Sequence, residues 1–284
     1  MNGRFVIWFL LLILPGVHGG AAGGGVAEII FLDVGQGDAA IIRSPEGKVA
    51  LVDAGRDLDI LPLLRRHDID SIDIAIASHP HADHIGGMER VIRSLPVRFY
   101  MDNGFPHTTA TYMNLMRTLQ ASDVTYLEAT ARTISLGSVE LTVLPPPARG
   151  EENLNNGSIG IVVRYGEFTA LLTGDSEVEE LNYFLSRGVP DVTLLKAAHH
   201  GSRDAVSPAW LSATKPEVVV ISCGRGNQYG FPHPWAMRYY GSVASAVYRT
   251  DLDGDVAVRI FSDGSYDVSV QLDRSSTGGR NDVH

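Results

Sequence analysis

The sequence predicts an α/β fold with many strands, and three observations support this. Short runs rich in Val, Ile and Leu recur along the chain and are bounded by turn-forming residues, a pattern typical of strands. Stretches with apolar residues at helical spacing lie between several of these runs. Apolar residues also make up 44% of the 284 positions, which is enough for one sizeable core.

The first part of the chain predicts three short strands followed by alternating helices and strands. Strands are expected at 26–33, 39–43 and 49–52, with a tight loop at 35–38 and a turn at 44–47. Strands joined by such short connections predict an antiparallel start to a sheet. Helices are then expected at 60–66, 88–94 and 109–121, and strands at 73–77, 97–101 and 124–127.

The second part of the chain is also predicted to contain both strands and helices. A strand at 139–144 precedes a loop at 145–156, and a hairpin of strands 159–165 and 168–172 turns at Gly166-Glu167. Further helices are expected at 177–186, 208–213 and 235–240, and further strands at 192–195, 218–221, 246–248, 256–261 and 266–272. The residues show no internal repeat and no second domain boundary.

The first 22 residues predict a secretory signal peptide. Arg4 precedes a run of ten apolar residues, then Pro15-Gly16 and small residues at 19–22. The run is short for a membrane span, which needs about 20 residues, so an uncleaved N-terminal membrane tether is the alternative. We expect cleavage between Ala21 and Ala27 and an extracellular or periplasmic location. One domain is expected at 23–272, followed by a disordered polar tail at 273–284.

A histidine-rich loop follows the buried strand at 73–77. It carries four potential metal ligands within six positions, namely His79, His81, Asp83 and His84. Open α/β layers place active sites at the carboxyl ends of their strands, and imidazole and carboxylate are the usual ligands of zinc-like ions. His79 and His81 are spaced to face one ion, while Asp83 and His84 follow a turn and can face a second. Such a density of ligand types disfavours an ordinary polar surface loop.

The spacing His-x-His-x-Asp-His before Gly86-Gly87 resembles the metallo-β-lactamase superfamily. A closer resemblance, from about Ala27 to Leu272, is to the hydrolase domain of competence-type DNA-uptake channel proteins, without their multi-pass membrane part. It rests on the histidine loop and on motifs at 32–39 (LDVGQGDA), 155–158 (NNGS), 173–175 (TGD), 199–202 (HHGS) and 249–251 (RTD). The resemblance implies an αββα sandwich, in which two mixed β-sheets pack face to face with helices outside.

The resemblance also implies roles for residues outside the loop. Asp175 corresponds to the carboxylate that bridges two metal ions, with a helix N-cap as the alternative. Asp53 corresponds to an acidic residue that supports the ligands, with an ordinary turn residue as the alternative. One residue of the pair His199 and His200 is expected to ligate, because neighbours in an extended chain point opposite ways. The residues do not decide which.

Two departures from the superfamily pattern bear on the site. No His lies between His107 and Asp175, where a third ligand of the first ion is common; Asn155, Asn156 and Ser158 stand there instead. An oxygen-rich site favours Mn²⁺, although Zn²⁺ is the expected ion. Relatives also often carry a His where Phe231 stands. His233 nearby either contacts substrate or caps a turn.

Three further residues belong to the matched motifs or to their flanks. Asp33 and Ser202 are expected to support the ligands or to contact substrate. Lys196 precedes the second histidine pair, and it either contacts an anionic substrate or is solvated.

The single Cys223 excludes a framework of intrachain disulfides.

These observations predict an exported hydrolase with two divalent ions. Such ions lower the pKa of a bridging water, and Asp83 is the expected catalytic residue that orients the resulting hydroxide. The predicted substrate is a phosphodiester, with DNA as a candidate; the net charge of −10 argues against a broad DNA groove. A small or cell-wall phosphodiester and a β-lactam are alternatives within the enzyme class. A catalytically inert secreted metal-binding module is the alternative of another class, and the residues identify no protein partner.

Overall fold

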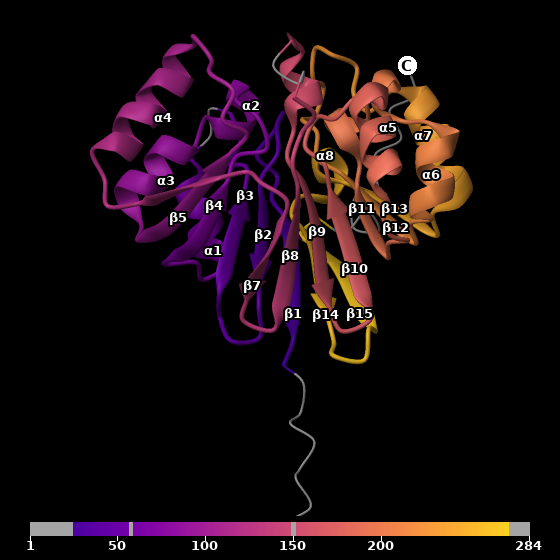
Figure 1. The fold of residues 1–284 in the computed structure, drawn as a ribbon. Coiled ribbons are helices and arrows are strands. Elements are labelled where there is room, and N and C mark those ends of the chain that lie inside the picture. Colours follow the sequence, from indigo (N-terminus) through magenta and orange to yellow (C-terminus); the bar gives the residue numbers. More distant parts are fainter. Residues whose placement is uncertain (1–24, 57–58, 149–151, 273–284) are drawn as a thin grey trace, which may run out of the picture.

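The computed structural model describes residues 25–56, 59–148 and 152–272. Two mixed β-sheets pack face to face, and helices cover their outer faces (Figure 1). The predicted αββα sandwich is therefore confirmed. The expected signal peptide at 1–22 and the expected tail at 273–284 lie outside the described residues. Within the described residues, no helix has the length and apolar character needed to cross a bilayer.

One sheet has eight strands. Their spatial order is β15 (Tyr266–Val270), β14 (Val256–Ile260), β1 (Ala27–Phe31), β2 (Ala40–Arg43), β3 (Val49–Val52), β4 (Ile72–Ile76), β5 (Val97–Asp102) and β6 (Thr125–Glu128). The strands β1, β2 and β3 are antiparallel, as their short connections predicted. From β3 to β6 the strands run parallel, because a helical segment crosses over between each pair.

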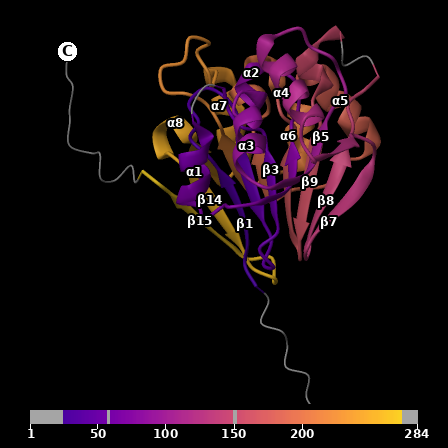
Figure 2. The same cartoon turned by 90° about the vertical axis from the view of Figure 1, so that its left-hand side faces the viewer.

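The other sheet has seven strands. Their order is β13 (Ala246–Arg249), β12 (Val218–Ile221), β11 (Leu194–Lys196), β10 (Phe168–Leu172), β9 (Gly160–Tyr165), β8 (Val139–Leu144) and β7 (Arg132–Leu136). Strands β7 to β10 are antiparallel and include the predicted hairpin β9–β10. Strands β10 to β13 are parallel. Figure 2 shows the two sheets as separate layers, with β14 and β1 in one layer and β8 and β7 in the other.

Three layers of apolar side chains hold this arrangement together. Ile29 and Phe31 of β1 point between the sheets and pack with Val163 of β9, whereas Ile30 points to the outer layer of the first sheet. That outer layer packs against α1 (Ile60–Arg66), α3 (Met88–Ser94) and α4 (Ala110–Gln120). The outer layer of the second sheet packs against α5 (Val178–Arg187), α6 (Pro208–Thr214) and α7 (Pro234–Val243). Strands buried on both faces explain the continuous apolar runs in the sequence.

The structure adds several elements that the sequence pattern did not predict. The strand β7 was missed because Ile134 and Leu136 are its only apolar residues and it lies at a sheet edge, largely exposed. The helices α2 (Ala82–Ile85) and α8 (Thr250–Asp253) are single turns, too short for a periodic signal. Short 3₁₀ turns form at η2 (Leu154–Gly157), η3 (Ala198–Gly201) and η4 (Arg203–Ala205). The first of these ends the segment 145–156, which was predicted as loop alone.

Candidate metal centre

The loops that follow β3, β4, β10 and β11 meet between the two sheets. They carry, in order, Asp53, the segment 78–84, Asp175 and the pair His199 and His200. Backbone hydrogen bonds join these loops: Ala54 N donates to His84 O at 2.7 Å, and His199 N donates to Gly174 O at 3.1 Å. The carboxyl ends of strands from both sheets thus supply one shared site, which is the edge predicted for it.

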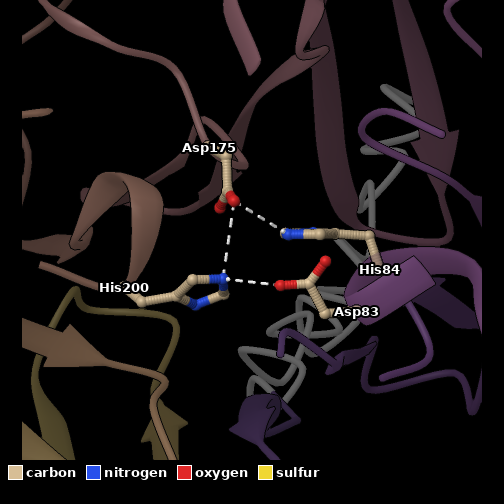
Figure 3. A group of neighbouring side chains, drawn as sticks. All are labelled: Asp83, His84, Asp175 and His200. Atoms are coloured by element: carbon tan, nitrogen blue, oxygen red, sulfur yellow. Dashed lines mark ion pairs between the residues drawn. The ribbon is translucent and has the colours of Figure 1, made fainter. Parts of the chain in front are cut away.

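Four side chains form the centre of this site: Asp83, His84, Asp175 and His200 (Figure 3). One ligand atom from each lies within 4.8 Å of all the others. The Asp175 Oδ2 atom is 3.2 Å from His84 Nε2 and 3.4 Å from His200 Nε2. His200 Nε2 is also 3.4 Å from Asp83 Oδ2. The two sheets therefore bring together residues that are far apart in the sequence.

The chemistry of this donor set fits a divalent metal ion. His84 Nε2, His200 Nε2 and Asp175 Oδ1 are buried and have no hydrogen-bond partner among the described residues. Buried polar atoms are nearly always paired, so three unpaired polar atoms on neighbouring side chains are unusual for a site made for hydrogen bonding alone. Imidazole nitrogen and carboxylate oxygen are the atoms that zinc and similar ions bind.

His79 and His81 add two further nitrogens beside Asp175. His79 Nε2 lies 2.9 Å from His81 Nδ1 and 4.0 Å from Asp175 Oδ2. Burial lowers the pKa of both imidazoles, and the nearby His84 lowers them further. A lowered pKa favours the neutral imidazole, the form that ligates metal ions. Burial acts in the same direction on His84 and His200, but the neighbouring carboxylates, Asp175 above all, raise the pKa of these two rings. The structure thus brings His79 and His81 together as the spacing predicted.

Asp53 contacts the far side of His84. Its carboxylate accepts hydrogen bonds from Ser78 N at 2.7 Å and from Ser78 Oγ at 2.8 Å. His84 Nδ1 lies 2.8 Å from Asp53 Oδ2, so that a proton held between them leaves His84 Nε2 free to face the centre. Ser222 O stands in the same relation to His200, at 2.9 Å from Nδ1. Both rings are oriented by a partner on the nitrogen that faces away from the centre.

The extended geometry assumed for His199 and His200 is wrong. Their φ angles are 45° and 53°, in the left-handed region, because the chain turns sharply through η3 after β11. His200 is fully buried against Asp83 and Asp175. His199 is 19% exposed, and its Nε2 atom is 3.8 Å from Asp175 Oδ2. Both rings thus face the same carboxylate, from different distances.

Comparison with known families agrees with this geometry. The sequence model of the Metallo-beta-lactamase superfamily matches residues 32–225, more than half of the chain. The chain belongs to the metallo-β-lactamase superfamily. This superfamily consists mostly of hydrolases, and its fold binds divalent metal ions at a cluster of His and Asp residues such as the one described above.

Several relatives of this metallo-β-lactamase superfamily member are competence or recombination proteins. "Recombination protein 2" of Haemophilus influenzae is 30% identical over 83% of the chain, and "ComE operon protein 3" of Bacillus subtilis is 25% identical over 89%. The chain spans only 29% and 35% of these two relatives. Among solved structures, CmlA, a diiron β-hydroxylase from Streptomyces venezuelae, superposes with a TM-score of 0.54 at 17% identity, over 82% of this chain and 54% of CmlA. That likeness concerns the fold alone.

A buried ion pair beneath the centre was missed by reasoning from the sequence. Lys196 Nζ donates a short hydrogen bond to Asp38 Oδ2 and a second one, of 3.1 Å, to Gly174 O. Asp38 Oδ1 is 3.3 Å from His200 Nδ1. Burial opposes ionisation of Asp38, but Lys196 and His200 hold its pKa down at about 2. Lys196 is 3% exposed, so of its two alternatives the one in which it is solvated is wrong.

The position of Asp38 in the sequence could have identified it as a residue of the site. Asp38 ends the glycine-containing turn at 35–38, inside the motif 32–39 on which the resemblance to a known family rests. The backbone shows what the turn does. Asp38 N donates to Asp83 O at 3.0 Å, and Gly55 N donates to Asp38 O at 2.8 Å. The turn therefore joins the loop of Asp83 to the loop that follows β3.

The segment of Asn155, Asn156 and Ser158 holds the loop of Asp175. Ser158 Oγ accepts from Asp175 N at 3.1 Å and lies 3.4 Å from His79 Nδ1. Asn155 Nδ2 donates to Glu177 Oε1 at 2.9 Å, and Asn156 Oδ1 accepts from Glu177 N at 3.0 Å. The N-cap of α5 is Glu177, so the alternative that Asp175 caps this helix is wrong.

Three predicted support residues make their contacts away from the central cluster. Asp33 Oδ1 accepts from Gly35 N at 3.2 Å, and Ser202 Oγ accepts from Asp204 N at 3.3 Å. His233 Nδ1 accepts from Trp235 N at 3.1 Å and thereby caps the start of α7. Of the two alternatives for His233, the structure shows the cap.

Glu180 of α5 is a second buried acid that the sequence did not single out. Its Oε2 atom accepts from Ser176 Oγ at 2.6 Å and from Ser158 N at 3.2 Å, while Oε1 is buried without a hydrogen-bond partner among the described residues. Burial raises the pKa of this carboxyl to about 8. The folded protein therefore holds a proton at neutral pH that the unfolded chain, with a pKa near 4.5, releases.

Glu180→Gln should remove a pH dependence of stability. Because the raised pKa makes the folded state bind the extra proton, wild type should lose stability as pH rises from about 4.5 through 8, by on the order of 5 kcal/mol. Glutamine mimics the protonated acid and should abolish this part of the slope. Urea unfolding at pH 5, 7 and 9 measures it. Glu179→Gln, an exposed neighbour, is the matched control and should keep the slope; an equal slope in wild type and Glu180→Gln would contradict the prediction.

Proposed function

We propose that the protein is a metal-dependent phosphodiesterase that uses two divalent ions, with DNA as the candidate substrate. The observation that carries the proposal is the convergence of orphaned imidazole nitrogens on Asp175 from both sheets. The names of the relatives, which concern recombination and competence, favour a substrate connected with DNA.

We assign the ligands in two groups that share Asp175. His79, His81 and Asp175 would hold one ion, and Asp83, His84, His200 and Asp175 would hold the other. Asp175 suits the shared role because its Oδ2 atom lies 4.0 Å or less from His79, His84 and His200. We assign His199 to the substrate, since it is partly exposed whereas His200 is buried. Zn²⁺ is the proposed ion because four imidazoles take part, with Mn²⁺ as the alternative.

The ions, when bound, would lower the pKa of a water and polarise the phosphoryl oxygen. The chain's own residues orient this chemistry. Asp53 and Ser222 O hold His84 and His200 in the tautomer with Nε2 turned to the centre. Asp83 is 24% exposed, so its carboxylate can reach both His200 and an entering water, accept a hydrogen bond from that water and direct its oxygen toward phosphorus.

The decisive test is an activity screen of the purified protein. It should compare bis-p-nitrophenyl phosphate, single-stranded DNA, duplex DNA and a β-lactam, each with Zn²⁺ or Mn²⁺ and with a chelator. We expect phosphodiester hydrolysis that the chelator abolishes. Hydrolysis of the β-lactam alone would favour that alternative, and hydrolysis of small phosphodiesters without DNA would favour a small or cell-wall substrate. No turnover with any metal would favour an inert metal-binding module and overturn the proposal.

Metal content provides a separate prediction. Protein prepared without chelator should contain up to two divalent ions per chain by elemental analysis. His79→Ala should lose the ion of the first group and keep the other, since His79 is assigned to the first group alone, whereas Asp83, His84 and His200 are assigned to the second. His233→Ala should keep both ions, because His233 only caps α7. No bound ion, even after metal is supplied to the intact protein, would refute the assignment.

We also propose that the segment 1–22 directs export, because Arg4, the apolar run that follows it and the small residues at 19–22 form a signal-peptide pattern. The N-terminus of protein recovered from the source cells should lie between Ala21 and Ala27 by N-terminal sequencing. Protein that starts at Met1 and is found in the cytosol would count against export, and one that starts at Met1 in the membrane fraction would favour the uncleaved tether.

A further inference from the structure

Two aromatic rings lie stacked and partly uncovered on the loop between β12 and α7. The rings of Tyr229 and Phe231 have centroids 5.6 Å apart and planes 18° apart. Tyr229 packs on Phe231 on one face and is 51% exposed. The stack thus presents a flat aromatic surface to solvent.

This stack adjoins the candidate metal centre. The Phe231 ring lies 5.4 Å from the ring of His199 and 6.2 Å from the ring of His200, which it meets at 33°. The exposed Tyr229 ring continues the stack outward. A molecule whose phosphate reaches His200 and Asp175 therefore has an aromatic surface within a few ångströms of that phosphate.

The loop that carries Tyr229 and Phe231 is held by hydrogen bonds within itself and to the turn of His199 and His200. Asn227 Oδ1 accepts from Tyr229 N at 3.2 Å and from Phe231 N at 3.0 Å, while its Nδ2 atom donates to Gly224 O at 2.9 Å and to Phe231 O at 2.6 Å. His233 N donates to Gly201 O at 2.9 Å, which ties the loop to the turn of His199 and His200. Gly201 has a φ of 77°, and a Cβ there would lie 2.7 Å from Pro232 Cβ, so this close approach requires glycine. The surface is preorganised, which reduces the entropy lost on binding.

We propose that Tyr229 and Phe231 form a stacking subsite for a nucleobase next to the scissile phosphodiester. The inference rests on the proposed function, because a base beside the centre matters only if a phosphodiester occupies it. Aromatic side chains bind bases of single strands through their π-faces, whatever the base, whereas the saturated groups of cell-wall phosphodiesters offer no such face. Bases of a duplex are already stacked on each other. The subsite therefore selects single-stranded nucleic acid.

The charge of the chain supports the same conclusion. With a net charge of −10, the protein has no general attraction for a polyanion, so affinity must come from local contacts. Stacking is such a contact, and it does not depend on counterion release. In the proposed subsite the aromatic pair would supply part of the affinity that other nucleic-acid-binding proteins obtain from clustered lysine and arginine.

The test is the binding of two fluorescent strands of equal length to metal-loaded protein, measured by anisotropy. One is a phosphorothioate oligothymidylate, which resists cleavage, and the other has the same backbone without bases. We expect wild type to bind the base-bearing strand about 10-fold more tightly. Tyr229→Ala should lose about 10-fold on that strand and little on the abasic one, whereas Tyr229→Phe should bind as wild type. Phe231→Leu keeps an apolar contact but removes a π-face, and it should weaken only the base-bearing strand.

Tyr126→Ala is the matched control, because Tyr126 is 48% exposed but lies on β6, at the far edge of the eight-stranded sheet. It should change neither affinity. Equal binding of both strands to wild type, or an equal loss on both strands in Tyr229→Ala, would overturn the subsite. These outcomes are independent of turnover. Failure to hydrolyse any phosphodiester would instead remove the proposed function, while base-selective binding that depends on Tyr229 would still support a base-binding surface.

Discussion

Asp83→Asn should lower the rate of phosphodiester hydrolysis by about 10²–10³ and leave the metal-free fold nearly unchanged. The substitution keeps the size of the side chain but removes the charge that faces His200 Nε2 at 3.4 Å and directs the attacking water. Loss of a bound ion would lower the rate further. The stability of the metal-free protein should change by about 1 kcal/mol or less, because Asp83 lies in a part-exposed turn and buries no apolar surface.

The measurements are turnover on bis-p-nitrophenyl phosphate with saturating metal, and melting temperature with chelator. Asp191→Asn is a suitable control, because Asp191 is an exposed aspartate whose carboxylate pairs with Lys215. It should match wild type in both. Unchanged turnover of Asp83→Asn together with a collapsed melting temperature would mean that Asp83 is structural, and the mechanism would have to be withdrawn.

Lys196→Met should destabilise the protein by about 3–5 kcal/mol, the largest loss of stability that we expect from a substitution. Methionine matches the length of the lysine stem but leaves the Asp38 carboxylate buried without its ammonium partner. The Gly174 carbonyl also loses a donor. Urea unfolding at pH 7 with chelator measures the change without any contribution from bound metal.

Lys215→Met provides the comparison, since the exposed pair of Lys215 and Asp191 has the same chemistry in water. Exposed pairs contribute little, so this variant should differ from wild type by about 0.5 kcal/mol or less. The double variant Asp38→Asn with Lys196→Met removes both charges and should recover part of the lost stability. If Lys196→Met and Lys215→Met were equally mild, the buried pair would not stabilise the fold.

Local patterns in the sequence were sufficient for most of the elements. The helices at 60–66 and 88–94 and the strands at 49–52 and 139–144 have the predicted bounds. Their apolar spacing is a local property and is bounded by nearby turn residues. The edge strand β7 was not predicted, because a strand at an exposed edge needs few apolar residues. Its position depends on its pairing with the neighbouring strand β8.

The sequence by itself also determined the kind of site. Four ligand-type residues in the short loop after a buried strand predict metal binding, because their covalent spacing keeps them close in any fold. The pairing of His79 with His81 depends only on that loop. The approach of Asp175 to His84 depends on two strands in different sheets, so spacing along the chain could suggest it only through the resemblance to a known family.

Only the tertiary structure decided what lies around the centre. The left-handed turn at η3 determines that His200, rather than His199, is buried against Asp83 and Asp175. The packing of the sheets places Asp38 and Lys196, which are 158 positions apart, in one buried pair. It also places Phe231 beside His199 and His200. These contacts arise where separate strands end at the same edge of the sandwich. Residue types and local spacing do not show which strand ends are neighbours there.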